Sequence, residues 1–221
     1  MSSGMMVGKT ALVTGATAGI VKATAVGRAR MGAHLAITGR DHGRTESPAC
    51  EIRVAGRETV DTLLADLSSQ REVRCLAEEV LQSPSRNDVL INYVGGYRDT
   101  RDVTVDGFAH TTGPIGFNGL QCERSYSGSR AYSQSKLADF LFTYESARKL
   151  QGTLVTANAL HPGVASTSAT SIYVASVPDL EQVTSRFFAH RKPKRSSQLS
   201  YDEATADQLG RVSANFVGLP Q

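Results

Sequence analysis

Tyr132 and Lys136 are the residues whose types and spacing most directly suggest chemistry. Four positions apart on a helix, they share one face, so the ammonium can stand beside the phenol. A neighbouring positive charge favours the phenolate, and it lowers the pKa of a phenol toward the range that acid/base catalysis requires. The same spacing also occurs by chance on surface helices, so the pair gains meaning only beside a second motif.

A glycine-containing turn at residues 14–20, Thr-Gly-Ala-Thr-Ala-Gly-Ile, supplies that second motif. It follows a strand-like run at 10–13 and precedes a helical stretch over about 18–31, which Gly32 can end. Glycine permits a sharp turn and the close approach of a pyrophosphate, while the helix N-terminus offers free N–H groups. The turn therefore indicates a dinucleotide-binding site.

The first half of the chain alternates strand-like and helical stretches, which is typical of parallel βαβ units. We expect further strands at 35–38, 59–64 and 88–92, a helix at about 44–55, and another that begins after Ser68 or Ser69. Pro48 weakens the prediction of the helix in which it lies.

The regular pattern stops between Gly95 and Ser129, where no convincing apolar strand occurs. It resumes with a helix over about 131–150, which carries Tyr132 and Lys136. A strand at 154–160 and helices at about 170–175 and 202–216 complete the expected elements. Because neither repeats nor a linker interrupt the chain, we expect residues 1–221 to form one domain.

Length and composition favour one ordinary globular domain. The chain has 221 residues, of which 40% are hydrophobic and 20% charged, and a net charge of +3, so no nucleic-acid partner is expected. The basic run 191–195 could attract phosphates or a membrane surface. Since no aromatic residue interleaves its charges, a solvated loop is the interpretation that we favour.

The three cysteines, Cys50, Cys75 and Cys122, match neither a disulfide framework nor a zinc pattern. They favour a reducing compartment, so we expect a cytoplasmic location and no metal site. No signal peptide is evident, and no apolar stretch is long enough to span a bilayer.

Taken in chain order, these features resemble the short-chain dehydrogenase/reductase family. The series continues with Asp66 after the third strand, Asn92 and Gly95-Gly96 after the fourth, and Pro162-Gly163 after a later strand. The resemblance covers residues 8–167 and, less specifically, the rest of the chain. The runs at 124–138 and 157–164 are most similar to the retinol-dehydrogenase-like branch. The resemblance implies an α/β Rossmann-type fold with a doubly wound, mostly parallel sheet.

The resemblance also implies roles for individual residues. Tyr132 would act as the acid/base, and Lys136 would bind the nicotinamide ribose while tuning the phenol. The other matching positions would bind the cofactor's phosphates, adenine, ribose and carboxamide. They are Gly15, Thr17, Gly19, Ile20, Asp66, Leu67, Asn92, Gly95, Pro162, Gly163 and Thr167.

The charge after the second strand bears on the choice of cofactor. An acidic residue there suits the ribose 2′-OH of NAD, whereas an arginine suits a 2′-phosphate. The strand ends Thr38-Gly39-Arg40-Asp41, and Arg40 therefore favours NADP, with NAD still possible. Arg40 could instead pair with Asp41 or with solvent.

The sequence departs from the family pattern in several places. The third glycine of the turn is Val21, whose branched side chain could push the helix away from the strand, and the second Asn after the fourth strand is Tyr93. Between Thr111 and Gly113 the chain lacks on the order of forty residues, a helix and the fifth strand of the doubly wound sheet. A second gap follows Thr167.

The first gap removes the family's structural Asn and catalytic Ser. Ser127, Ser129 or Ser133 could substitute for that serine, although ordinary polar residues at the start of a helix are the interpretation that we favour. Loss of a central strand should also expose the edges of its neighbours, an aggregation risk unless the sheet closes up.

Two functions of different classes follow, with a third possibility beside them. The first is an NADP-dependent oxidoreductase that interconverts a small apolar alcohol and a carbonyl. The second is a catalytically impaired dinucleotide-binding protein that acts as a sensor or interaction partner, and the third is a truncated product that folds poorly. The resemblance implies a homodimer or homotetramer, because relatives often pair through the helix with the Tyr–Lys motif.

Overall fold

The computed structural model describes residues 4–56, 59–111, 115, 117–163 and 168–219. The chain divides into two compact units by its internal contacts. The first comprises Met1–Gly95, Leu160–Leu180 and Ala189–Arg191. The second comprises Gly96–Ala159, Glu181–Phe188 and Lys192–Gln221.

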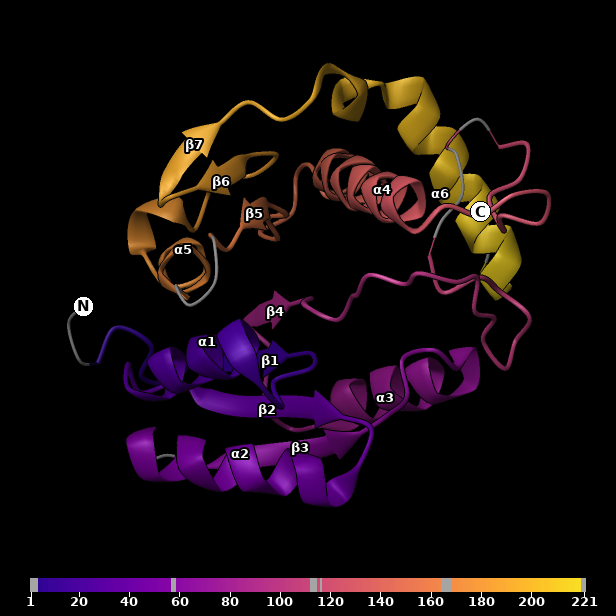
Figure 1. Cartoon of the computed structure of the whole chain (residues 1–221). Helices are drawn as coiled ribbons and strands as arrows, with labels where there is room; N and C mark the ends of the chain where they lie inside the picture. Colours follow the sequence, from indigo (N-terminus) through magenta and orange to yellow (C-terminus); the bar gives the residue numbers. More distant parts are fainter. Residues whose placement is uncertain (1–3, 57–58, 112–114, 116, 164–167, 220–221) are drawn as a thin grey trace. The chain divides into compact units, whose positions relative to one another are not determined.

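A four-stranded sheet forms the centre of the first unit (Figure 1). Its strands lie in the order β3-β2-β1-β4, and all three pairings are parallel. They are β1 (Thr10–Val13), β2 (His34–Gly39), β3 (Val60–Leu64) and β4 (Val89–Ile91). The chain runs outward from β1 to β3 and then returns to the other side of β1, as in a doubly wound sheet. The expected fold class is confirmed.

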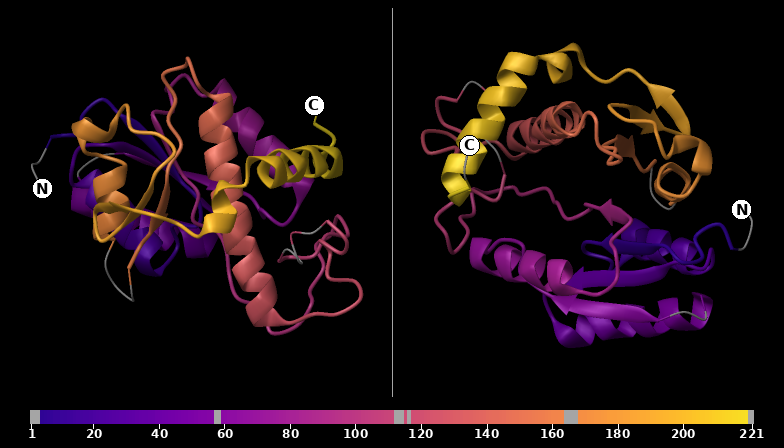
Figure 2. Two further views of the ribbon diagram at one scale, coloured as in Figure 1. Left: turned by 90° about the horizontal axis from the view of Figure 1, so that it is seen from above. Right: turned by 180° about the vertical axis from the view of Figure 1, so that it is seen from behind.

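Two helices cover one face of this sheet, and a third lies over the other (Figures 1 and 2). α1 (Gly19–Ala29) and α2 (His42–Gly56) pack on the apolar side, where their alanines meet Val13, Leu35 and Ile37 in the buried core. α3 (Gln70–Gln82) lies over the opposite side, from which it is separated by a groove of about 780 Å³.

The ends of these helices follow from local side chains. Ser69 begins α3 by accepting a hydrogen bond from the Glu72 backbone N–H at 3.4 Å. Asp41 begins α2 in the same way, by accepting from the Arg44 N–H at 2.8 Å. Pro48 lies inside α2 and is buried, so the helix continues through the residue that weakened its prediction.

A further short helix, α5 (Ala169–Val174), packs on α1 within the first unit. Its Ile172 lies directly above Gly27, where a Cβ would collide with the isoleucine side chain. Tyr93, which replaces the family's second Asn, is half-buried and forms a hydrogen bond between its hydroxyl and that of the buried Ser171. The substituted residue therefore holds α5 against the end of β4.

The second unit is built around α4 (Gly128–Lys149), which packs against α6 (Glu203–Val217) and η2 (Gln198–Tyr201). Another 3-10 helix, η1, spans Pro178–Leu180 in the first unit. Between β4 and α4, the described residues form no helix or strand, only an isolated bridge from Val103 to Ala109. The expected break in regular structure is thus observed.

The strand expected at 154–160 is largely wrong. Only Ala159–His161 forms a strand, β5, and it belongs to a small separate sheet with β6 (Phe187–Ala189) and β7 (Lys192–Lys194). Leu154 is fully exposed, so the apolar letters that suggested a buried strand do not reach a core. Before β5, the side-chain amide of Asn158 donates to the Val183 carbonyl, and the Ala157 carbonyl accepts from the Ser185 N–H at 2.9 Å.

Within the described ranges, the sheet of the first unit ends at β4, so the fifth parallel strand is absent from it, as expected. β4 is its outermost strand on that side, and Leu90 in its centre is 54% exposed. All three cysteines are free, and the described residues contain no cluster suited to a metal ion. In the part of the chain that the structure describes, no helix combines the length and apolarity needed to cross a bilayer.

Candidate functional site

Most of the predicted cofactor-binding residues lie in the first unit, just after the carboxyl ends of its parallel strands. Gly15 follows β1, Arg40 follows β2, Asp66 follows β3 and Asn92 follows β4. The strand order reverses at β1, because β2 and β3 lie on one side of it and β4 lies on the other. Ligands of open α/β sheets bind at the carboxyl ends of the strands where the strand order reverses. The structure therefore brings these residues to one edge of the sheet.

Gly15 occupies a position that only glycine fits without strain. Its φ is +72°, and an added Cβ would lie 2.8 Å from a methyl of Val94. The Gly15 N–H donates to the Thr38 carbonyl at 3.2 Å and to the Thr38 hydroxyl at 3.1 Å. The turn is thus fixed against the end of β2.

Thr14 fixes the same turn against β4. Its hydroxyl donates to the Ile91 carbonyl at 3.3 Å and accepts from the Tyr93 N–H at 3.0 Å. Thr14 and Thr38 are both buried. Neither threonine was predicted as a site residue, although their place at the ends of neighbouring strands is a usable signal.

The N-terminus of α1 follows the turn and has no side-chain cap. The residue before the helix is Ala18, whose side chain cannot accept from the first N–H groups. At Gly19, where φ is +60°, the space that a Cβ would occupy is open. Val21, which stands where the family has its third glycine, is half-buried and packs against the core. The resulting turn can take a pyrophosphate against free helix N–H groups.

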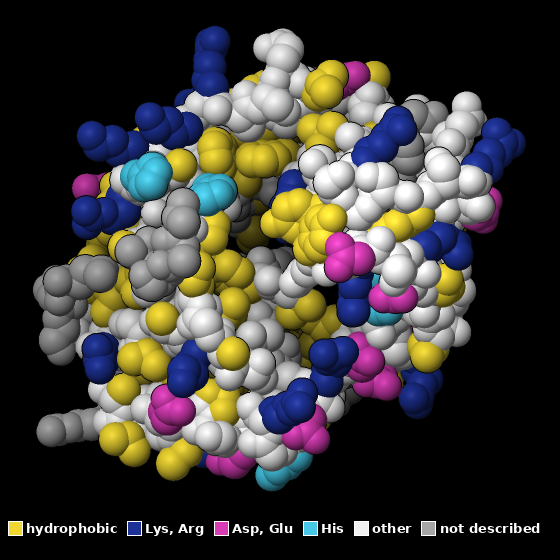
Figure 3. Space-filling model, in the orientation of Figure 1, with side chains coloured by type: hydrophobic (Ala, Val, Ile, Leu, Met, Phe, Trp, Pro, Cys, Tyr) yellow, Lys and Arg dark blue, Asp and Glu magenta, His cyan; other side chains and the backbone are white. Residues whose placement is uncertain are grey.

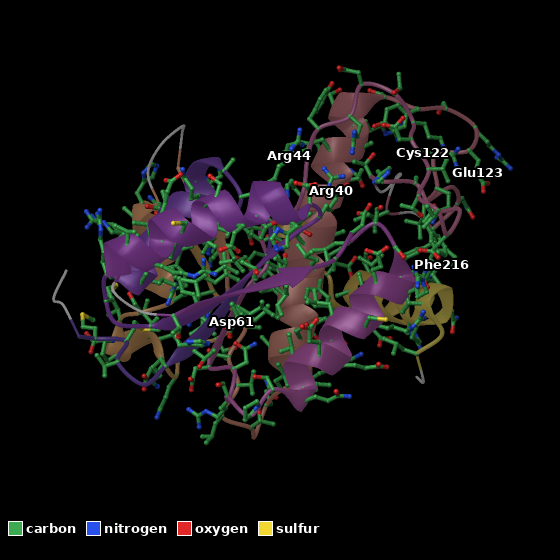
Figure 4. The ribbon with its side chains drawn as sticks, turned by 90° about the horizontal axis from the view of Figure 1, so that it is seen from below. Arg40, Arg44, Asp61, Cys122, Glu123 and Phe216 are labelled. Carbon is green, nitrogen blue, oxygen red and sulfur yellow. The ribbon has the colours of Figure 1, made fainter. Side chains whose placement is uncertain are left out.

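Two arginines flank the start of α2 (Figure 4). Arg40 follows β2 directly, Arg44 lies in the first turn of α2, and both are exposed. The carboxylate of Asp41 caps α2 instead of pairing with Arg40. Among the described residues neither guanidinium forms an ion pair, so both remain available to a phosphate. Arg44 was missed because the family pattern pointed to Arg40 alone.

Asp66 and Leu67 are half-buried in the turn after β3. A carboxylate oxygen of Asp66 accepts from the Ser68 N–H at 3.0 Å, and its own N–H donates to Glu72 at 2.7 Å. These bonds fix the turn. Asn92 and Gly95 are exposed after β4, and Thr17 and Ile20 are half-buried in the first turn.

The loop predicted to hold the nicotinamide carboxamide is described only in part. Pro162 and Gly163 are half-buried after β5, and Gly163 has a φ of +99°. The Gly163 N–H donates to Nδ1 of His161 at 3.0 Å. Thr167, the third residue of this prediction, lies outside the described residues.

Tyr132 and Lys136 lie in the second unit, on one face of the first turns of α4. Tyr132 is 39% exposed. The Lys136 ammonium is 5.6 Å from the centre of the tyrosine ring, and it forms an ion pair with Asp139 at 3.0 Å. Asp139 was not anticipated, although its i,i+3 spacing from Lys136 suits a helix pair.

The segment after β4 passes close to the start of α4. The ring of Tyr97 lies 6.0 Å from that of Tyr132, and a Cβ on Gly128 would be 2.8 Å from the Tyr97 hydroxyl. Gly128 therefore lets the segment approach the helix closely. No local sequence pattern predicted that Tyr97 would lie beside Tyr132.

The three serines that could replace the missing family serine have other bonds. The Ser133 hydroxyl donates to the Ser129 carbonyl at 2.9 Å, and the hydroxyls of Ser127 and Ser129 lie 3.3 Å apart. Among the described residues none donates a hydrogen bond to the Tyr132 phenol. This agrees with the expectation that they are polar residues at a helix start.

Comparison with known proteins supports the same class of protein. Residues 9–111 match the sequence profile of the family described as short chain dehydrogenase. Mouse retinol dehydrogenase 14 is 33% identical, over 98% of this chain and 88% of its own length. Its alignment covers 293 positions, which exceeds the 221 residues here by 72, so this relative contains segments that the chain lacks.

Solved structures have the same fold. An uncharacterised protein from Mycobacterium paratuberculosis matches with a TM-score of 0.86 and 26% identity, over 97% of this chain and 96% of that one. L-sorbose reductase from Gluconobacter frateurii, solved in complex with NADPH and L-sorbose, matches with a TM-score of 0.56 and 21% identity, over 72% and 71%.

The chain belongs to the short-chain dehydrogenase/reductase family, a family of NAD(P)-dependent oxidoreductases. Its place in the retinol-dehydrogenase-like branch, expected from its motifs, is confirmed by retinol dehydrogenases about 30% identical over nearly its whole length.

Proposed function

We propose that the protein is an NADP-dependent oxidoreductase that interconverts a small apolar alcohol and its carbonyl by hydride transfer. The observation that carries the proposal is the glycine turn at the end of β1, with an uncapped helix N-terminus behind it and two unpaired arginines after β2. These features fit a dinucleotide that bears a 2′-phosphate.

Different residues would bind different parts of this cofactor. Gly15 and Gly19 give the pyrophosphate access to the backbone and to the N–H groups of α1. Arg40 and Arg44 would bind the 2′-phosphate, a role that suits planar guanidinium groups. L-sorbose reductase, which has a similar fold, was solved in complex with NADPH, and this supports the choice of NADP.

In the proposed reaction the nicotinamide, when bound, supplies or accepts the hydride. Tyr132 gives its phenolic proton to the carbonyl oxygen during reduction and takes a proton from the alcohol in the reverse direction. Lys136, one helical turn away, holds its ammonium 5.6 Å from the centre of the tyrosine ring and would bind the hydroxyls of the nicotinamide ribose. The apolar character of the substrate rests on the relatives named as retinol dehydrogenases.

The test is oxidation of NADPH with a panel of apolar aldehydes and ketones, in wild type and in Tyr132→Phe. We expect turnover to fall by about 100-fold or more in the variant, the usual contribution of a positioned acid/base. Fluorescence titration with NADPH measures cofactor binding separately, and the variant should bind as wild type does.

Equal turnover in both proteins would remove Tyr132 from the mechanism. Binding of NADPH without turnover in wild type would replace the proposal by its rival, a dinucleotide-binding protein without catalysis. Absence of binding would exclude both functions.

A further inference from the structure

The positive charge of this protein is concentrated in one segment of the second half of the chain. Residues 182–201 contain five of the 24 Lys and Arg and none of the 21 Asp and Glu. The remainder has 19 basic and 21 acidic residues, so its formal charge is negative although that of the whole chain is +3. The five basic residues are Arg186, Arg191, Lys192, Lys194 and Arg195.

The segment presents these side chains on a β-hairpin. β6 and β7 are joined by a two-residue turn, His190 and Arg191, whose φ angles are +53° and +61°. Positive φ at both positions suits the tight turns of hairpins. All three residues of β7 are exposed, and Lys and Arg side chains gather around this hairpin on the surface in Figure 3.

Nothing in the described structure neutralises this charge. None of the five basic side chains forms an ion pair with a described residue, whereas Lys22, Arg53, Arg86 and Arg148 elsewhere all do. Five cations within residues 186–195, with no ion-pair partner among the described residues, raise the local potential and attract an anionic surface.

The hairpin is poorly suited to a protein strand or a single-stranded nucleic acid. β7 is the outer strand of its sheet, but Pro193 at its centre lacks the N–H that pairing would need. Its aromatic neighbours are poorly placed for base stacking, since Phe188 is buried and Phe187 packs edge-on against Phe140. One face of the Tyr201 ring is likewise covered, because it stacks on Tyr144 with the ring centres 5.2 Å apart.

Apolar side chains follow directly after the basic run. Leu199 is 67% exposed and Tyr201 is 45% exposed, both in η2. Basic residues beside exposed apolar and aromatic side chains are typical of proteins that rest on a lipid headgroup layer.

We propose that the β6–β7 hairpin and η2 form a peripheral binding site for bilayers that contain anionic phospholipids. The basic side chains would contact the headgroups, with Leu199 reaching into the interface. The cytoplasmic leaflet carries the anionic lipids, which agrees with the location expected from the sequence. This site does not depend on the proposed oxidoreductase activity, although it would place the protein where an apolar substrate dissolves.

The test is co-sedimentation of the whole chain with vesicles of phosphatidylcholine, with and without phosphatidylserine. We expect strong binding only to the anionic vesicles, weakened as salt is raised from 0.01 M to 1 M. Lys192→Gln/Lys194→Gln should lower the affinity about 25-fold, at about fivefold for each basic side chain. The control Arg71→Gln/Arg74→Gln removes two charges from α3 and should bind within about twofold of wild type.

Far-UV circular dichroism of both variants checks that they remain folded. Equal binding to the two kinds of vesicle, or an equal loss in the control, would contradict the proposal. Binding of a DNA oligonucleotide at the same salt, lost in the hairpin variant while vesicle binding persists, would assign the hairpin to nucleic acid instead. Because none of these measurements uses turnover, they stand whether or not the enzyme proposal fails.

Discussion

The ammonium of Lys136 lies 5.6 Å from the centre of the Tyr132 ring and 3.0 Å from a carboxylate oxygen of Asp139. The lysine is thus close both to the tyrosine that it is proposed to assist and to the Asp139 carboxylate, which offsets its charge. Both neighbours come from the same helix, so this arrangement is local to α4.

Replacing Asp139 by Asn should raise turnover, because the positive charge of Lys136 is then no longer offset beside the phenol. We expect a gain of up to about fivefold, the upper range for an exposed ion pair. The midpoint of thermal unfolding should change little, because an exposed ion pair contributes at most about 1 kcal/mol to stability. A loss of turnover would show that Asp139 positions Lys136 rather than competing for it.

Replacing Lys136 by Met should lower turnover by about 100-fold or more, since the proposed proton transfer loses its neighbouring charge. Steady-state NADPH oxidation measures the effect, and Lys149→Met, at an exposed lysine that pairs with Glu145 at the other end of α4, is the matched control. Unchanged turnover in Lys136→Met would exclude the assisting role.

The two arginines at the start of α2 should determine the choice of cofactor. Arg40→Gln removes one of the hydrogen-bonded charges proposed for the 2′-phosphate, each worth about 1.5–3 kcal/mol. We therefore expect the Kd for NADPH to rise about tenfold to 100-fold, while the Kd for NADH stays within about twofold. Arg44→Gln should act in the same direction.

Fluorescence titration with both dinucleotides measures these constants, with Arg71→Gln as a control on α3. An equal loss for NADH and NADPH would mean that the arginines hold something other than the 2′-phosphate.

The first unit could be predicted from the sequence because its signals are local. β1 and β4 are short apolar runs, and α3 starts at a recognisable N-cap residue, Ser69. The glycine turn was predictable for the same reason, since Gly15 is demanded by a positive φ that other residues seldom adopt.

The second unit was less predictable. The hairpin of β6 and β7 gave no signal, because Lys192-Pro193-Lys194 lacks strand residues and its turn is closed by His-Arg rather than Asn-Gly. The apolar letters of Leu154 and Val155 suggested a strand, yet both side chains are exposed. Whether Ser127, Ser129 or Ser133 donates to the Tyr132 phenol depends on long-range contacts, and no local sequence pattern encodes these.

Asp88 should make the stability of the first unit sensitive to acid. Burial acts to raise the pKa of this carboxyl, but a hydrogen bond from the Thr10 N–H at 2.9 Å and the neighbouring Arg86 outweigh it and lower the pKa. The stabilisation is therefore complete above the ordinary carboxyl pKa and is lost as the pH falls through the lowered value.

Asp88→Asn should lower the free energy of unfolding by about 1 kcal/mol at pH 7, and the difference from wild type should disappear as the pH falls through the lowered pKa of Asp88. Urea unfolding over this pH range measures it, and Asp99→Asn, at an exposed carboxylate, should follow wild type throughout. A difference that persists unchanged in acid would contradict the role of the charge.

Arg28 should destabilise the protein, since its guanidinium is fully buried in α1 without a carboxylate partner. Its Nε and Nη2 find no hydrogen-bond partner among the residues that the structure describes, and Nη1 lies 3.9 Å from the Met6 sulfur. Burial lowers the pKa of Arg28 from 12.5 to about 10. At 1.36 kcal/mol for each pKa unit, this corresponds to a cost of about 3 kcal/mol at neutral pH.

Arg28→Leu should therefore raise the free energy of unfolding by about 3 kcal/mol, with Arg28→Met as a variant closer in shape. The cost is complete below a pH of about 10 and shrinks above it, because the native state then releases the proton while the unfolded chain retains it. The advantage of the variant should decrease accordingly as the pH rises above 10. Urea unfolding with Arg30→Leu, two residues further along the chain and exposed at the end of α1, is the control. If Arg28→Leu and Arg28→Met were both less stable than wild type, the prediction would be wrong, because other interactions would then offset the burial of the guanidinium.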